Sequence, residues 1–186
     1  FIATSNACIH ANLIPVFVDV DPMSYNLDPK RIEEKITEKT VAIMPVHTFG
    51  QPCEMDAICE IAQKYKLKIV EDCAEAHFAH YKGRPVGSFG KVAGFSTYVA
   101  HTITTGVGGV ITTNDPEVAE VCRSLIAHGR ACTCEKCIAS SPHSVCRKRL
   151  STEIDRRFMM VRIGYSYRIG ELEGALGLAQ VETRDE

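Results

Sequence analysis

The sequence predicts an α/β domain in which a mostly parallel sheet is flanked by helices. Three observations support this fold class. Short apolar runs alternate with amphipathic segments along the chain, which is typical of parallel strands joined by helical crossovers. The 186 residues, 45% hydrophobic and 24% charged, are enough to bury one core. Polar residues stand where strands end, as in open sheets that bind ligands at their carboxyl edge.

The predicted strands are short runs of apolar, largely β-branched residues. Such runs, bounded by turn residues, favour buried strands over helices because they are too short for a helix. The runs cover residues 15–20, 40–46, 68–73, 92–98 and 109–113.

Three helices are predicted between and after these strands. Asp28, followed by proline, indicates a helix start, and that helix continues to residue 36. Residues 54–67 place Ile58 and other apolar residues on one face, the pattern of a surface helix. Asp115, again followed by proline, begins a helix that runs to residue 128 and is closed by Gly129.

Composition narrows the classes of function. The formal net charge is −2 and the pI is near 6.4, so no basic surplus suggests nucleic acid as a partner. No apolar run approaches the roughly 20 residues that span a membrane, and no signal peptide is visible. We therefore expect a cytoplasmic protein without a membrane partner. The chain begins without methionine and stops inside a helical pattern, so we expect a domain truncated at both ends.

Three polar side chains lie at or near the ends of two neighbouring predicted strands. Asp72 ends the strand at 68–73, Ser96 lies within the strand at 92–98, and His101 lies just beyond it. Each also has a structural interpretation: Asp72 as a helix cap, Ser96 as a partner of the backbone, and His101 as a surface residue. Their joint placement before the glycine-rich segment "TTGVGG" favours a ligand site, because glycines let backbone amides approach an anion such as a phosphate.

The cysteines are concentrated in one irregular segment. Four of the nine, Cys132, Cys134, Cys137 and Cys146, lie within "CTCEKCIASSPHSVC". A secreted disulfide scaffold would spread its cysteines over the whole chain. Four close thiolates instead favour a metal ion or an iron–sulfur cluster, and spacing alone cannot choose between zinc and iron. Residues 130–163 are therefore predicted to form an irregular cysteine-rich insertion.

Several blocks of the sequence carry a family resemblance. "FIATSNA", "PVFVDVDP", "MPVHTFGQP", "IVEDCAEAH", "FSTYVAH" and "GYSYRIGELEGALGLAQVE" resemble, in order, the DegT/DnrJ/EryC1/StrS family of sugar aminotransferases. The resemblance implies a pyridoxal-phosphate (PLP) transferase of fold type I that acts on nucleotide-linked keto sugars as a homodimer. Residues 1–186 would then be the cofactor-binding large domain.

The resemblance assigns roles to individual residues. Asp72 matches the aspartate that pairs with the pyridine nitrogen of the cofactor and keeps the ring able to accept electrons. Ser96 matches a hydroxyl ligand of the cofactor phosphate. Phe1 falls where an aromatic ring stacks on the pyridine, and Glu75 falls where a side chain touches the phenolic oxygen of the ring.

His101 departs from the aminotransferase pattern. The matching position in those enzymes is a lysine that holds the cofactor covalently, and an imidazole cannot supply a primary amine. Histidine can instead move protons near neutral pH. The substitution resembles the 3-dehydratases of deoxysugar biosynthesis, which use the pyridoxamine form (PMP) to remove the C3 hydroxyl of a nucleotide 4-keto-6-deoxyhexose. His101 would be the catalytic base.

The cysteine segment resembles one subtype of these dehydratases. That subtype carries a [2Fe–2S] cluster that passes electrons from a reductase, and "GRACTCEKC…C" matches its cysteine arrangement. Cys132, Cys134 and Cys146 are the predicted ligands, with Cys137 or Cys73 as the fourth. The alternatives are an aminotransferase homologue whose cysteines hold a structural zinc, and a non-catalytic member of the family.

The last of the quoted sequence blocks, residues 164–182, predicts an interface between helices. Small residues at Gly170, Gly174 and Gly177 allow close approach by another helix, either from a second subunit or from the same chain. Tyr167 and Arg168 precede these small residues, and an arginine there could bind an anionic group of the substrate or cofactor. We therefore expect Tyr167 and Arg168 to contact the substrate.

Overall fold

The computed structural model describes residues 1–134, 137, 144–146 and 153–184. Its centre is a four-stranded sheet with the strand order β1-β2-β5-β6, in which β1, β2 and β5 are parallel and β6 is antiparallel to β5. The mostly parallel sheet of the predicted α/β class is therefore confirmed. The strands are β1 (Ala42–Ile43), β2 (Lys68–Asp72), β5 (Val92–Ser96) and β6 (Gly109–Thr112).

The register brings the ends of two strands to one edge of the sheet. Asp72, the last residue of β2, pairs with Gly94 of β5, and Ser96 ends β5 two residues later. The predicted strand at 40–46 is shorter as a regular strand, but Val46 still forms a parallel bridge with Asp72. The chain before and after β1 therefore follows β2 up to the same edge.

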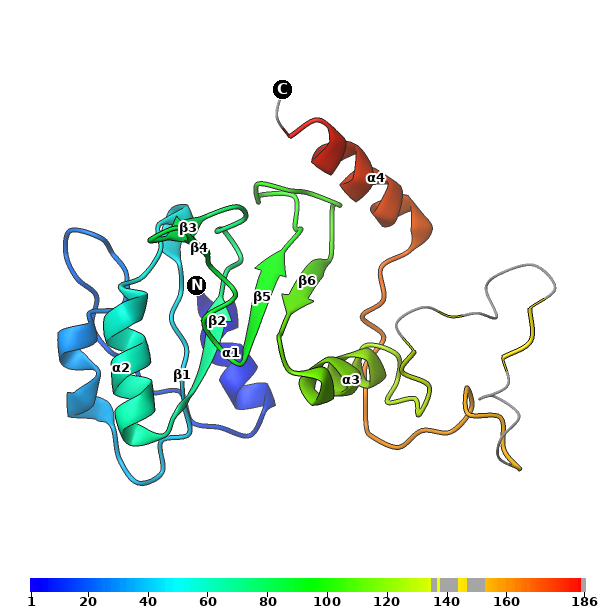
Figure 1. The fold of residues 1–186 in the computed structure, drawn as a ribbon, viewed down its shortest axis with the longest axis horizontal. Coiled ribbons are helices and arrows are strands. Elements are labelled where there is room, and N and C mark those ends of the chain that lie inside the picture. Colours follow the sequence, from blue (N-terminus) through cyan, green and yellow to red (C-terminus); the bar gives the residue numbers. More distant parts are fainter. Residues whose placement is uncertain (135–136, 138–143, 147–152, 185–186) are drawn as a thin grey trace.

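Helix α2 (Met55–Tyr65) covers the β1–β2 side of the sheet (Figure 1). Ile58 and Ala62 of this helix are buried with Ile43 of β1 and Ile69 of β2, and these side chains form the larger core cluster. The predicted apolar face of residues 54–67 is thus confirmed. Helices α3 (Pro116–Leu125) and α4 (Glu171–Glu182) lie on the β6 side (Figure 1).

Helix α3 begins as predicted and ends earlier. The Asp115 carboxylate accepts hydrogen bonds from the amides of Glu117 and Val118, at 2.8 and 3.2 Å, and so caps the first turn. Gly129 follows the helix with φ +79°, and a Cβ on it would lie 1.9 Å from the carbonyl oxygen of Arg162. Only glycine fits this position, because both the backbone angle and the close approach exclude a side chain.

Two predicted elements are wrong. Residues 15–20 form no strand, since only Val20 pairs, in an isolated bridge with Leu27. The predicted helix from Asp28 to residue 36 is instead two short 3-10 turns, η1 (Pro29–Arg31) and η2 (Glu33–Lys35). Their backbone hydrogen bonds span three residues, for example from Ile32 to Pro29, so the chain tightens and no regular α-helix develops.

Four elements were not predicted. Helix α1 (Ile2–His10) opens the chain, and β3 (His80–Tyr81) and β4 (Arg84–Pro85) form a small antiparallel hairpin. A further turn, η3 (Thr48–Gly50), follows the β1 segment. Within 130–163, the residues that the structure describes lie outside helices and named strands. Over the described ranges, no helix is both long and apolar enough to cross a membrane.

Candidate functional site

Asp72 stands at the carboxyl edge of the sheet with its carboxylate held from two sides. The hydroxyl of Thr4 donates to Oδ2 at 2.7 Å, and the amide of Ala74 donates to Oδ1 at 3.1 Å. The Asp72 side chain is half-buried. Each carboxylate oxygen can accept two hydrogen bonds, so the group retains capacity for a ligand donor such as a protonated ring nitrogen.

The first turn of helix α1 is attached to this edge through Thr4. Thr4 lies in the first turn of α1, and its bond to Asp72 fixes that turn beside the end of β2. Phe1 immediately precedes the helix and is fully exposed. Residues three apart at a helix start lie on the same side, so the contact of Thr4 supports a position for the Phe1 ring near Asp72.

Glu75 lies in the turn after Asp72 and is exposed. Its carboxylate oxygen Oε2 accepts a hydrogen bond from the amide of Phe49 at 2.8 Å. Phe49 has a left-handed backbone conformation, with φ 53°, which is unfavourable for a bulky residue. Glu75 thus holds the turn at Thr48–Gly50 against the same edge of the sheet.

Ser96 is oriented by the loop that follows it. Its hydroxyl oxygen accepts a hydrogen bond from the amide of Tyr98 at 3.2 Å. The backbone carbonyl of Ser96 is bonded to Nε2 of His77 at 2.7 Å, and the His77 ring lies against Phe95, with ring centroids 5.2 Å apart. The Ser96 hydroxyl therefore keeps its own proton for donation, for example to a phosphate oxygen.

His101 lies in a loop that hydrogen bonds fix in place. The hydroxyls of Thr97 and Thr105 are buried and 2.7 Å apart, and the amide of His101 donates to the carbonyl of Tyr98 at 2.9 Å. Gln180 of α4 accepts a hydrogen bond from the Thr104 amide at 3.5 Å. These contacts hold the loop between β5 and β6 at the end of the sheet that carries Ser96.

The imidazole of His101 has an unsatisfied nitrogen. Its Nδ1 is buried and has no hydrogen-bond partner within the part of the chain that the structure describes. Such a group costs free energy and calls for an explanation, of which a catalytic role is one. The nitrogen, the Asp72 carboxylate and the Ser96 hydroxyl are the groups that a PLP-type cofactor and its substrate need, so the described residues fit the cofactor chemistry.

A buried polar cluster beneath this edge was not predicted. Side chains of His47 and Glu71 are completely buried, with Nε2 and Oε2 3.3 Å apart. Glu71 also accepts from the amides of Gly87, Phe89 and Gly90, at 2.7, 2.8 and 2.6 Å. Nδ1 of His47 accepts from the Cys53 amide at 3.0 Å, so the imidazole proton is on Nε2 and points at Glu71.

This cluster, with Cys73, has the residue types of a metal site. Ligand atoms of His47, Glu71 and Cys73 lie within 4.8 Å of one another. However, the hydrogen bonds occupy the His47 nitrogens and the Glu71 oxygens, and burial raises the pKa of the Cys73 thiol, followed by the charges of Glu71 and Asp72. Because these hydrogen bonds already use the His47 and Glu71 atoms that would bind a metal, we interpret the cluster as structural. Polar residues within the apolar runs "MPVHT" and "KIVED" were the sequence signal for it.

The four clustered cysteines are near the surface. Cys134 and Cys137 are exposed, and Cys132 and Cys146 are partly buried. Among the described residues, no three of their sulfurs lie within 4.8 Å of one another. The pKa of the nearby Arg157 is raised by its hydrogen bonds to Asp155.

Tyr167 and Arg168 lie between the cysteine segment and α4. The Tyr167 ring stacks on Tyr165, with centroids 4.8 Å apart and 3° between the ring planes. Arg168 Nη2 is 3.4 Å from Nε2 of His128 in an exposed contact. Both side chains are accessible to a ligand, and their contact with a substrate stays a prediction.

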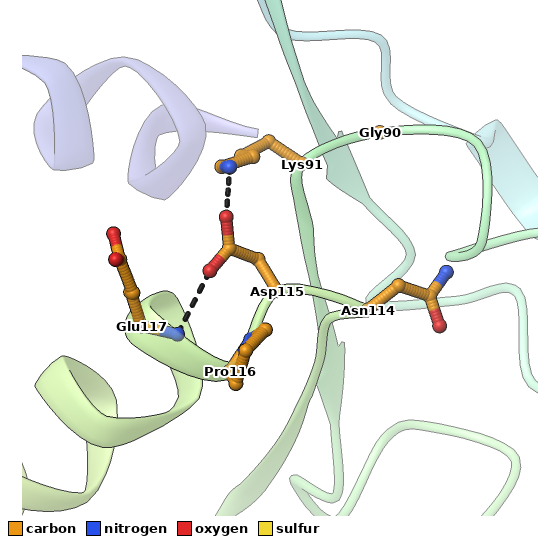
Figure 2. Close-up of a pocket in the computed structure, with 6 residues that line it drawn as sticks. All are labelled: Gly90, Lys91, Asn114, Asp115, Pro116 and Glu117. Atoms are coloured by element: carbon orange, nitrogen blue, oxygen red, sulfur yellow. Dashed lines mark hydrogen bonds and ion pairs between the residues drawn. The ribbon is translucent and has the colours of Figure 1, made fainter.

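An open surface pocket lies elsewhere, at the start of α3. It is lined by Gly90, Lys91, Asn114, Asp115, Pro116 and Glu117 (Figure 2). Asp115 already pairs with Lys91 and caps the helix through the Glu117 amide. Because Lys91 precedes β5 while Ser96 ends it, this pocket lies at the opposite edge of the sheet from Asp72 and Ser96.

Known proteins resemble this chain in both sequence and fold. Over 186 residues the chain is 39% identical to a GDP-perosamine synthase of Caulobacter vibrioides, covering 100% of this chain and 44% of that protein. An aminotransferase from Psychrobacter cryohalolentis matches the fold with a TM-score of 0.82 and 34% identity, over 98% of this chain and 43% of that one. The chain thus spans less than half the length of these relatives.

A dehydratase shares the fold as well. The GDP-4-keto-6-deoxy-D-mannose-3-dehydratase of E. coli, with bound hydrated PLP, has a TM-score of 0.73 and 29% identity, over 89% of this chain and 41% of that one. The model of the DegT/DnrJ/EryC1/StrS aminotransferase family matches residues 1–186. With the sheet, the Asp72 edge and this match over its whole length, the chain belongs to the DegT/DnrJ/EryC1/StrS aminotransferase family.

Proposed function

We propose that the protein is a PMP-dependent 3-dehydratase of deoxysugar biosynthesis, and that its substrate is a nucleotide-linked 4-keto-6-deoxyhexose. The proposal rests on the presence of a histidine, His101, at the key position of the site. It occupies the position where the resemblance expects the aminotransferase lysine, and no lysine occurs between Lys91 and Lys136. The unpartnered, buried Nδ1 of His101 supports a role in proton transfer.

Each residue of the site has its own role in the proposed reaction. When bound, the cofactor supplies an amine that condenses with a keto group and a ring that accepts electrons. Asp72 pairs with the ring nitrogen, Ser96 donates to the phosphate, and Phe1 covers one ring face. His101 would remove a proton from the amine-bearing carbon while the C3 hydroxyl leaves, so that one water is eliminated from the joined cofactor and substrate. Two electrons and two protons, from the cofactor itself or from a reductase, would then complete the replacement of the C3 hydroxyl by hydrogen.

Product analysis tests the proposal. Incubation of the full-length protein with PMP, a nucleotide 4-keto-6-deoxyhexose and a chemical reductant such as dithionite should give a sugar that is lighter by one oxygen atom, measured by mass spectrometry. His101→Gln should abolish this loss of oxygen while leaving PMP binding in place. Formation of an amino sugar from glutamate by the unsubstituted protein, without dehydration, would identify a transaminase and overturn the proposal.

For the cysteine segment we propose a [2Fe–2S] cluster bound by Cys132, Cys134, Cys146 and Cys137. Cys137 is favoured over Cys73 as fourth ligand because it is exposed and lies in the same segment as the other three cysteines, whereas Cys73 is buried in the core. Such a cluster supplies one-electron transfer from a reductase, which zinc cannot do. Electron paramagnetic resonance after anaerobic purification and dithionite reduction tests this. A silent spectrum with stoichiometric zinc would support a structural metal.

We also propose that residues 1–186 form the large domain of a homodimeric enzyme, with 130–163 as an insertion. Helix α4 supports this because Leu172, Leu176 and Leu178 are 81%, 56% and 60% exposed, and exposed apolar rows mark interfaces. Tyr167 and Arg168 would reach substrate at this interface. Sedimentation of the full-length protein tests the dimer, and a fully active monomer would exclude it.

A further inference from the structure

The hydrogen bond between Thr4 and Asp72 joins two distant parts of the chain. The two residues are separated by 68 positions, and the hydroxyl of Thr4 donates to Oδ2 of Asp72 at 2.7 Å. Donation to an ionised carboxylate makes a short, strong hydrogen bond. Together with the Ala74 amide on Oδ1, it gives each carboxylate oxygen one fixed donor.

Two fixed donors set the plane of the carboxylate. The terminal torsion of an aspartate side chain is otherwise broad, so an unheld carboxylate would sample many orientations. A pairing with a ring N–H is directional, because the hydrogen must lie near the plane of the accepting group. Each oxygen of Asp72 keeps one acceptor site, and the donors from Thr4 and Ala74 determine where those sites point.

We infer that Thr4 is a positioning residue for the cofactor: it orients the Asp72 carboxylate toward the pyridine nitrogen and ties α1, with Phe1 at its start, to the same group. One bond then sets both the in-plane partner and the stacking partner of the ring. The inference rests on the cofactor assignment of the proposed function. It does not depend on whether the reaction is a dehydration or a transamination.

The test uses the full-length protein and three matched variants. Thr4→Val removes the hydroxyl at nearly constant shape, and Thr4→Ser retains it. Ser5→Ala is the control, because the Ser5 hydroxyl in the same turn bonds to the carbonyl of Ile2, at 2.9 Å, and not to Asp72. Two quantities are measured for each: the Kd for PMP, and the 15N chemical shift of the ring nitrogen in bound, 15N-labelled PMP.

Thr4→Val should weaken PMP binding by about tenfold or more, as expected for a lost hydrogen bond to a charged group. Its ring 15N shift should move toward that of an unprotonated pyridine. Thr4→Ser should restore both quantities, and Ser5→Ala should change neither. In an Asp72→Asn background, Thr4→Val should have little further effect, which separates positioning from a general loss of folding.

Thr4→Val with the parental Kd and 15N shift would overturn the inference, as would equal losses in Thr4→Val and Ser5→Ala. Failure of the proposed function has a different signature. If the protein binds PMP, shows the Thr4 effect and yet transaminates, the dehydratase assignment fails while the role of Thr4 stands. Absence of any PMP binding by the unsubstituted protein would refute both.

Discussion

Replacing Glu71 with glutamine tests how firmly the carboxyl end of β2 is held. Oε1 accepts from the amides of Phe89 and Gly90, at 2.8 and 2.6 Å, and Oε2 accepts from Gly87 and His47, at 2.7 and 3.3 Å. Glutamine keeps only one acceptor oxygen, so its NH2 group must face two N–H donors. At about 1–3 kcal/mol for each buried donor without an acceptor, the free energy of unfolding should fall by about 2–6 kcal/mol.

Urea unfolding followed by circular dichroism measures this loss. It is a large share of the about 5–15 kcal/mol that stabilises a typical domain, so Glu71→Gln should also lower the melting temperature clearly. The matched control is Glu60→Gln on the exposed face of α2, which should stay within about 0.5 kcal/mol of the parent. Equal effects of the two substitutions would refute the structural role assigned to Glu71.

The effect of Glu71→Gln should also depend on pH. Burial alone would raise the pKa of Glu71, but hydrogen bonds from His47 and the amides of Gly90 and Gly87 outweigh burial and lower it below the ordinary value of 4.5. A carboxyl whose pKa is lowered by folding stabilises the protein above its unfolded pKa, and that contribution is lost as the pH falls through the folded pKa. The free energies of unfolding of the parent and of Glu71→Gln should therefore differ most at neutral pH and become equal in acid. A difference that persists in strong acid would contradict this.

Three further predictions concern the site and the fold. Asp72→Asn should lower activity at least about tenfold more than Glu75→Gln, because it removes the charge that pairs with the ring nitrogen; equal kcat/KM values would contradict the assignment. Borohydride should not fix PLP to the polypeptide, since His101 cannot form the bond that a lysine forms; a reduced adduct on a peptide, found by mass spectrometry, would refute it. Gly129→Ala should lower the free energy of unfolding by about 3 kcal/mol or more through strain and a backbone clash; thermal unfolding compares it with the parent, and equal stability of the two would contradict the close approach at Gly129.

The sequence predicts the parallel core well because its signals are local. The apolar runs of β2 and β5, the amphipathic face of α2 and the Asp115 cap of α3 each have a pattern that acts within a few residues. The hairpin of β3 and β4 also had such a signal. Lys82 and Gly83 form its two-residue turn, both with positive φ, and a glycine in such a turn indicates a hairpin.

The missed elements depend on contacts far along the chain. Helix α1 has no acidic residue in its first turn and no side-chain cap, and its sequence "IATSNACIH" contains mostly weak helix formers. It is held by Thr4 on Asp72, which no local pattern reveals. The segment 15–20 fails as a strand for the converse reason: its residues favour extended structure, but apart from the bridge at Val20 the described residues offer no strand beside it.

At this edge of the sheet, structural residues differ from candidate catalytic residues in how many hydrogen bonds they already make, not in residue type. Glu71 and Asp72 are adjacent carboxylates, yet Glu71 accepts from four protein donors whereas Asp72 accepts from two. The histidines show the same contrast: both ring nitrogens of His47 are bonded, while Nδ1 of His101 has no partner in the described ranges of the chain. A fully bonded buried group can do no further chemistry without breaking the fold. Asp72 and His101 retain unused capacity, and for that reason we propose Asp72 as the cofactor-pairing group and His101 as the acid–base group of the site.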